Sequence, residues 1–299
     1  MLDRARSVCV ARCVLGLTLY TRHRAPGDAR GVAALLRAFL DAAPAGGGLL
    51  FRTSLMPAWG RLSAREHGAL VARVADEVLG ATARHLFSVH LADAPDAPGV
   101  FFLYREVDEA RGAGAGYVQL GLPPEAPSAA LFQLAMEAAH SVPLWCGTGG
   151  YLGSAHPVEV CSAYEGLWAW SRRYLGLDVQ DAERGRHHAA AGLTGVNWLT
   201  LVGGGLMEAL GADRAALARD VAAAGADWIE APGAALVRAG EEPTLGDANL
   251  LQYPEPYGRA AAALASLAPE SPPRWYGGFW EDDGAARWSR RFTEPEGWS

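Results

Sequence analysis

The chain has 299 residues, of which 50% are hydrophobic, 20% are charged and 9% are aromatic, and its formal net charge is −7. This composition excludes a disordered chain, which would be poor in aromatic residues, and no heptad pattern indicates a coiled coil. All 26 basic residues are Arg, since the sequence contains no Lys. A negative net charge argues against a general nucleic-acid binder, which normally carries a basic stripe, and leaves room for a basic protein partner.

The cysteine content and the apolar stretches bear on the compartment. Four cysteines in a chain of this length are too few and too scattered for a disulfide scaffold. The apolar stretch 13–20 runs directly into Arg22 without a small-residue cleavage site, which favours a buried strand over a signal peptide. The longest run without Asp, Glu, Arg or His, 189–207, contains five Gly and would make a poor membrane helix. We therefore expect a cytoplasmic protein with no membrane partner.

The first part of the chain alternates strand and helix signals. An apolar stripe of 3.6-residue period follows Asp28, and Ser63 with Glu66 forms a capping box that opens a second helix. The patterns predict, in chain order, a strand at 14–20, a helix from Asp28 onward, a strand at 49–55, a helix after Ser63, and strands at 85–91 and 100–106.

After a Gly-rich joint at 111–116 the alternation starts again. The patterns predict a strand at 117–122, a helix at 128–140 capped by Ser128, a strand or loop at 144–152, a helix at 159–174, a polar stretch at 178–191, a strand at 196–202, and helices at 206–210 and 213–224. These alternations indicate a mixed α+β fold in which helices pack on a sheet. Two βαβα-type halves, 1–110 and 117–268, would form one compact unit, and 269–299 would be an aromatic, acidic C-terminal extension.

Motifs for catalysis are missing. A phosphate-binding loop needs a Lys that this chain lacks, and no Gly-x-Ser-x-Gly nucleophile elbow occurs. We therefore expect no catalytic residue and no cofactor. One alternative is a metal-dependent enzyme. A metal site needs three or four converging His, Cys or carboxylate ligands, and one part of the sequence is rich in such residues. The densest group of such residues is His140, Cys146, His156, Glu159 and Cys161.

Two groups of acidic residues are candidates for partner binding. Asp93 and Asp96 lie in the loop that joins two predicted strands. Glu281, Asp282 and Asp283 follow Trp280 at the end of an aromatic run. A charge run is usually a solvated face, but Trp and Tyr are enriched in binding hot spots, so aromatic neighbours favour an interface here. Adjacent His187 and His188 favour a solvated loop pair, since neighbouring side chains diverge on any regular element.

Several segments resemble a known family. The run Arg173-Tyr-Leu-Gly-Leu-Asp-Val179, the run Gly195-Val-Asn-Trp-Leu-Thr200 and the turn Gly246-Asp-Ala-Asn249 are similar to motifs of the bacterial type VI immunity family, also known as DUF3396. Pro254-Glu-Pro-Tyr257 then matches the opening of the family's final helix. The resemblance extends to about residue 268. Leu175 departs from the family, which has Pro there.

The resemblance implies a non-enzymatic immunity protein that binds and neutralises a cognate bacterial toxin. The toxin would be basic and would act as a nuclease in some members. From the residues alone, Asn197 is suited to hold a turn, Trp198 to fill the core, and Asp247 with Asn249 to supply turn and cap chemistry. We therefore interpret these positions as determinants of the fold. A second alternative is a general protein-interaction module without a toxin partner.

Overall fold

The structure is a computed structural model that describes residues 2–3, 8–21, 26–44, 48–56, 58–80, 87–106, 115–157, 159–273, 280 and 283–298. Its centre is a ten-stranded sheet in which every neighbouring pair is antiparallel, in the order β11-β12-β10-β9-β3-β8-β7-β6-β4-β5. The strands are β3 (Ala11–Thr21), β4 (Leu49–Thr53), β5 (Gly60–Leu62), β6 (Ser88–Ala92), β7 (Phe101–Arg105), β8 (Gly116–Leu122), β9 (Leu144–Ala155), β10 (Leu199–Gly203), β11 (Asp227–Glu230) and β12 (Ala234–Arg238). The short strands β1 (Leu2–Asp3) and β2 (Val8–Cys9) form a separate hairpin.

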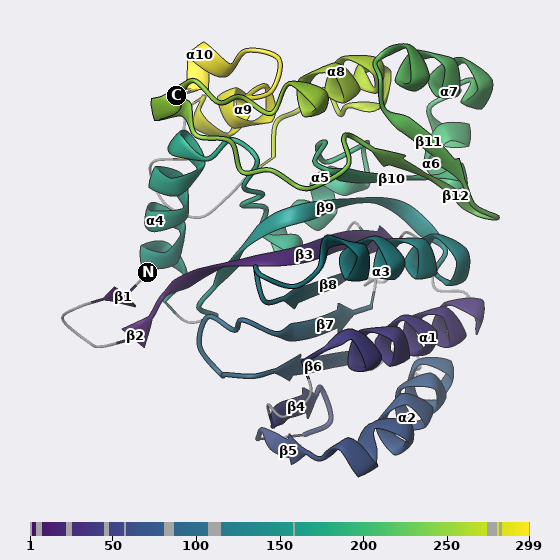
Figure 1. The fold of residues 1–299 in the computed structure, drawn as a ribbon. Coiled ribbons are helices and arrows are strands. Elements are labelled where there is room, and N and C mark those ends of the chain that lie inside the picture. The colour runs from purple at the N-terminus through teal and green to yellow at the C-terminus, as the bar shows by residue number, and fades with distance from the viewer. Residues whose placement is uncertain are drawn as a thin grey trace.

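Three helices cover one face of the sheet. α1 (Pro26–Ala42), α2 (His67–Gly80) and α3 (Ser128–Ser141) lie side by side along this face (Figure 1). The predicted stripe of α1 is fully buried: Leu35, Leu36 and Phe39 have no exposed surface and pack with Leu15, Leu17 and Leu19 of β3 in the main hydrophobic core. The capping box is also confirmed, because the backbone N–H of Ser63 donates to Glu66 Oε2 at 2.8 Å.

The remaining helices gather around β9 to β12 and the chain end. They are α4 (Val160–Arg173), α5 (Ala182–Ala189), α6 (Gly204–Ala209), α7 (Arg214–Ala223), α8 (Glu255–Ala263), α9 (Gly284–Ser289) and α10 (Pro295–Trp298), with the short 3₁₀ helices η3 (Ala248–Leu250) and η4 (Ala265–Leu267). A further 3₁₀ helix, η1 (Ala64–Glu66), directly precedes α2. Figure 1 shows α9 and α10 beside the end of α4. The predicted mixed α+β class, with helices packed on a sheet, is confirmed.

The central strand comes from the start of the chain. β3 pairs with β8 on one side, where Leu15 lies opposite Leu122. On its other side it pairs with β9, where Ala11 lies opposite Ala155. It therefore lies between two strands of the second predicted half, and both halves contribute to one sheet. The proposed border near residue 268 stays a prediction. No helix within the described residues is long and apolar enough to span a membrane.

Some sequence assignments were wrong in detail. The polar stretch 178–191 contains α5, so His187 and His188 lie on a helix and not in a loop. Asp181 begins this helix by accepting the backbone N–H of Arg184. Ser128 is the first residue of α3 and its cap position is Pro127. The predictions missed β11 and β12, whose short hairpin lies at the sheet edge.

Candidate partner-binding surfaces

The second face of the sheet is partly open over β4, β6, β7 and β8. Strand pairing aligns Arg52, His90, Leu103 and Gln119 in one row, because directly opposed residues point to the same face. Arg52 is exposed, and the other three are half-buried. The row leads to buried Thr18 on β3, whose hydroxyl oxygen accepts a hydrogen bond from Gln119 Nε2 at 3.1 Å.

This open area forms a groove of about 440 Å³, the sheet groove, lined by Arg52, Thr53, Ser54, Met56, Phe87, Ser88, His90, Leu103, Arg105 and Tyr117. The Trp59 and His90 rings are 4.8 Å apart, and Arg52 lies 5.3 Å from the Trp59 ring centre. Burial, with a further contribution from Arg52, lowers the pKa of His90 to about 4. His90 is therefore neutral at pH 7 and adds an uncharged aromatic ring to the lining of the groove.

Glu183 of α5 contacts two residues that line this groove, Arg105 and Tyr117. Its carboxylate accepts Arg105 Nη1 at 2.7 Å, Arg186 Nη1 at 3.0 Å and the Tyr117 hydroxyl at 3.2 Å. Burial, followed by the Glu183 charge, raises the pKa of Tyr117, so the phenol stays protonated and donates. These contacts fix α5 on β7 and β8 and leave Arg52 as the exposed cation at the far end of the row.

Asp93 lies at the edge of a second hollow. It is exposed, and its Oδ1 accepts the backbone N–H of Gly99 at 3.0 Å, which closes the loop after β6. The hollow has a volume of about 510 Å³ and is lined by Arg12, Cys13, Asp93, Gly99, Val100, Pro123, Pro124, Glu125 and Trp170. Asp96, in the same loop, is half-buried. The candidate carboxylate Asp93 therefore lies beside an arginine and a tryptophan from two other elements.

The second candidate group consists of Trp280 and the acidic residues after it. Trp280 is only 4% exposed, and its indole N–H donates to the carbonyl oxygen of Tyr164 at 3.3 Å. Its ring stacks on Trp298 at 5.8 Å. The expectation that Trp280 offers exposed aromatic area is therefore corrected, because α4 and α10 cover it. Asp283 is exposed, whereas Glu281 and Asp282 lie outside the described residues.

A buried arginine, Arg291, connects this C-terminal segment to the rest of the fold. Arg291 is 2% exposed, its Nε donates to the carbonyl oxygen of Leu175 at 2.8 Å, and its guanidinium lies 3.6 Å from the Trp288 ring centre. Burial lowers the pKa of Arg291 to about 9, an effect that the charge of nearby Asp178 opposes. Burial likewise raises the pKa of Asp178, although Thr148 and Gln180 donate to its carboxylate. The segment is thus part of the folded body.

The structure does not bring the five possible metal ligands together. His140 Nδ1 lies 2.7 Å from the carbonyl oxygen of Met136, in its own helix. Cys146 is buried on β9 with Sγ directed at the carbonyl of Gly192, and Cys161 is exposed on α4. His156 Nδ1 accepts the backbone N–H of Glu159 at 3.0 Å. Among the described residues, no three His, Cys, Asp or Glu side chains are grouped so that they could hold a metal ion.

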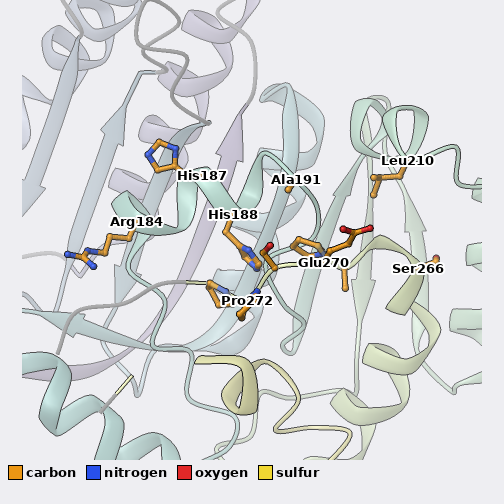
Figure 2. A pocket seen from close by; sticks show the side chains of 12 residues that line it. Arg184, His187, His188, Ala191, Leu210, Ser266, Glu270 and Pro272 are labelled. Carbon is orange, nitrogen blue, oxygen red and sulfur yellow. The ribbon is translucent and has the colours of Figure 1, made fainter. Parts of the chain in front are cut away.

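A pocket of about 860 Å³ lies between α5 and the segment after η4. It is lined by Arg184, His187, His188, Ala191, Leu210, Ser266, Ala268, Pro269, Glu270, Ser271, Pro272 and Pro273. Figure 2 shows His188, Glu270 and Pro272 in the middle of the view, with Arg184 and His187 at one side. Burial lowers the pKa of His188 to about 4, so this histidine is neutral at pH 7. Sequence patterns did not reveal this pocket, because they predicted no helix at 182–189.

Open grooves lined by arginine, carboxylate and aromatic side chains are surfaces suited to binding another protein. The chain belongs to the family of type VI immunity proteins for VRR-NUC, whose family model matches residues 43–292. This finding confirms the resemblance seen in the sequence. The match also includes most of the segment after residue 268.

A solved structure similar to this chain is the Pseudomonas aeruginosa T6SS protein PA0821. The two share 17% sequence identity with a TM-score of 0.76, over 97% of this chain and 86% of that one. The likeness shows that the two proteins have the same fold. No curated protein sequence matches this chain.

Proposed function

We propose that this chain neutralises a VRR-NUC nuclease toxin of a type VI secretion system by binding it directly, without catalysis, in the cytoplasm. The observation that carries this proposal is the family match over residues 43–292. The charge of the chain is suited to this role, because a nuclease must contact phosphates through cationic side chains and this chain has a net charge of −7. An acidic protein is steered toward such a surface and can occupy it.

The test is inhibition of the purified nuclease. The VRR-NUC toxin from the same genome should degrade plasmid DNA, and an equimolar amount of this chain should stop the degradation. The two proteins should also elute together from a gel-filtration column. An unrelated acidic protein of similar charge serves as the control. Free toxin activity in the presence of excess chain would reject the proposal, and it would favour an interaction module with a different partner.

The acidic residues that the fold leaves accessible are the proposed steering groups. Asp93 and Asp283 are exposed, and Asp96 is half-buried beside Asp93. Changing all three to Arg reverses local charge without removing a core side chain. We expect association to slow about tenfold at low salt, with a weaker dependence on ionic strength and little change in dissociation. The matched control reverses the exposed pair Arg290 and Glu294, which leaves the net charge unchanged.

Stopped-flow or biosensor kinetics at several salt concentrations would measure this effect. If the triple variant associates at the wild-type rate at every ionic strength, these carboxylates do not steer the toxin.

A further inference from the structure

The loop 247–252 carries two neighbouring leucines that are exposed to solvent. Leu250 is 64% exposed and Leu251 is 75% exposed. Single exposed leucines are common on protein surfaces, whereas two in succession bring two large apolar side chains to one exposed turn. Of the four large hydrophobic side chains exposed among the described residues, these two are the most exposed. We call Leu250 and Leu251 the leucine tip.

Leu251 has a backbone conformation that leucine rarely adopts. Its φ of 55° and ψ of 30° place it in the left-handed region, where the Cβ atom of a branched side chain is crowded. It is the one residue other than Gly with positive φ in the described part of the chain. Gly or Asn would adopt this conformation at a lower cost in folding free energy. Strain of this kind is concentrated at binding and catalytic sites.

Hydrogen bonds at the base of the loop fix its conformation. The backbones of Asp247 and Gln252 exchange both hydrogen bonds, at 2.9 and 3.0 Å, so the chain enters and leaves the tip at one point. The Asp247 carboxylate accepts the backbone N–H of Asn249 at 3.1 Å and Arg173 Nη2 at 2.7 Å. Arg173 belongs to α4 and also lies over the Tyr174 ring. A tip that is already ordered loses little conformational entropy when it binds.

The charge of the segment that carries the tip indicates the kind of partner. Residues 241–258 contain four carboxylates and no arginine. Arg173 offsets Asp247, and Arg259 lies 3.6 Å from Glu255, so exposed Glu241 and Glu242 leave this segment negative. A complementary surface has an apolar hollow with cationic side chains around it. A protein that handles nucleic acid presents such cations to the phosphates.

We propose that the leucine tip inserts into an apolar hollow of the toxin that is bordered by basic residues, and that it anchors the inhibitory complex. This inference rests on the proposed function and adds the contact that determines the lifetime of the complex. Buried apolar anchors act mainly on dissociation, whereas charges at the edge of an interface act mainly on association. Glu241 and Glu242 thus speed association with the partner, and the two leucines slow its dissociation.

Two substitutions separate binding from folding. Leu250→Asp places a charge in the buried contact and should weaken toxin affinity about 30-fold or more, mainly through faster dissociation. Leu251→Asn relieves the left-handed strain, so the melting temperature should rise by about 1–3 °C while affinity falls about tenfold. Leu55→Asn is the matched control, since Leu55 is 55% exposed outside the tip and should leave both quantities unchanged.

Affinity and lifetime are measured by biosensor with the purified VRR-NUC toxin, melting by scanning fluorimetry, and self-association by sedimentation. Variants that fold normally but release the toxin faster support the proposal. Wild-type affinity in both tip variants overturns it, as does an equal loss in Leu55→Asn. A wild-type dimer that Leu250→Asp dissociates without loss of toxin binding assigns the tip to self-association and also overturns it. If the wild-type chain binds no toxin, the proposed function itself fails.

Discussion

Trp280 and the leucine tip differ in exposure: the tryptophan is buried and the leucines are exposed, although their local sequences suggest the opposite. Trp280 stands beside acidic residues and resembles an interface anchor, yet it is buried against Tyr164 and Trp298. Leu250 and Leu251 follow a turn that the sequence predicts to be a determinant of the fold, yet both are exposed. The difference is decided by distant partners: α4 lies under the tryptophans, and no described segment covers the leucines. Local composition identifies an apolar residue, but the tertiary fold decides whether that residue belongs to the core or the surface.

The largest expected effect comes from the tryptophan cluster. Trp280→Ala removes a ring that stacks on Trp298 and a hydrogen bond to α4, so it should lower the free energy of unfolding by about 3–5 kcal/mol. Urea titration would measure this loss. Below the melting temperature, the affinity for the toxin should stay at the wild-type value. A variant of wild-type stability with weakened binding would restore Trp280 as an interface anchor and break the comparison.

A somewhat smaller loss should follow Arg291→Met. The change removes the hydrogen bond to the Leu175 carbonyl oxygen and leaves buried Asp178 without its nearby cation. The free energy of unfolding should fall by about 3 kcal/mol. Arg290→Met is the matched control, because the Arg290–Glu294 pair is exposed and its loss should change stability by less than about 0.5 kcal/mol.

Thermal unfolding of both variants tests whether the buried cation fixes the C-terminal segment. If Arg291→Met is as stable as Arg290→Met, Arg291 does not stabilise that segment. Adding Asp178→Asn to Arg291→Met should recover part of the lost stability, since the buried carboxylate charge is then also removed.

The smallest expected effect concerns the leucine tip and the arginine that contacts its base. Arg173→Gln breaks the bidentate contact with Asp247 and leaves both leucines in place. A looser tip must be ordered on binding, so affinity for the toxin should fall about threefold. The melting temperature should fall by about 1–4 °C, because the buried Asp247 carboxylate loses its charged partner. Calorimetric titration should show the loss of affinity as a less favourable binding entropy. Arg172→Gln on the same helix turn is the control, and an equal effect there would indicate general charge removal.

The sequence predicted those parts of the fold that depend on local patterns. The stripe around Leu36, the capping box at Ser63 and the buried strand at 14–20 each follow from a short-range rule, and each is present. Trp198 is buried, and Asn197 accepts the backbone N–H of Trp198, as their residue types indicated. α5 was missed because its mean composition is polar; its buried face carries Gly185 and Ala189, which give no apolar stripe.

The candidate surfaces were harder to predict. The row from Arg52 to Gln119 depends on the register between four strands, which no single segment encodes. Exposure of Asp93 agrees with its place in a loop, but burial of Trp280 depends on α4, more than 100 residues earlier in the chain. The leucine tip had a local signal, since two leucines directly follow the turn residues Asp247 to Asn249. A turn that continues into leucine is a candidate for an exposed apolar tip.

The position of β3 has a consequence for how the protein is made. Residues 11–21 are synthesised well before their partners, because β8 and β9 are complete only after Leu122 and Ala155 have been added. At about 5–20 residues per second, the apolar strand waits on the order of 10 s with both edges unpaired. During synthesis it is therefore open to aggregation or to a chaperone. We therefore expect the yield of folded protein to depend on this interval as well as on the stability of the finished fold.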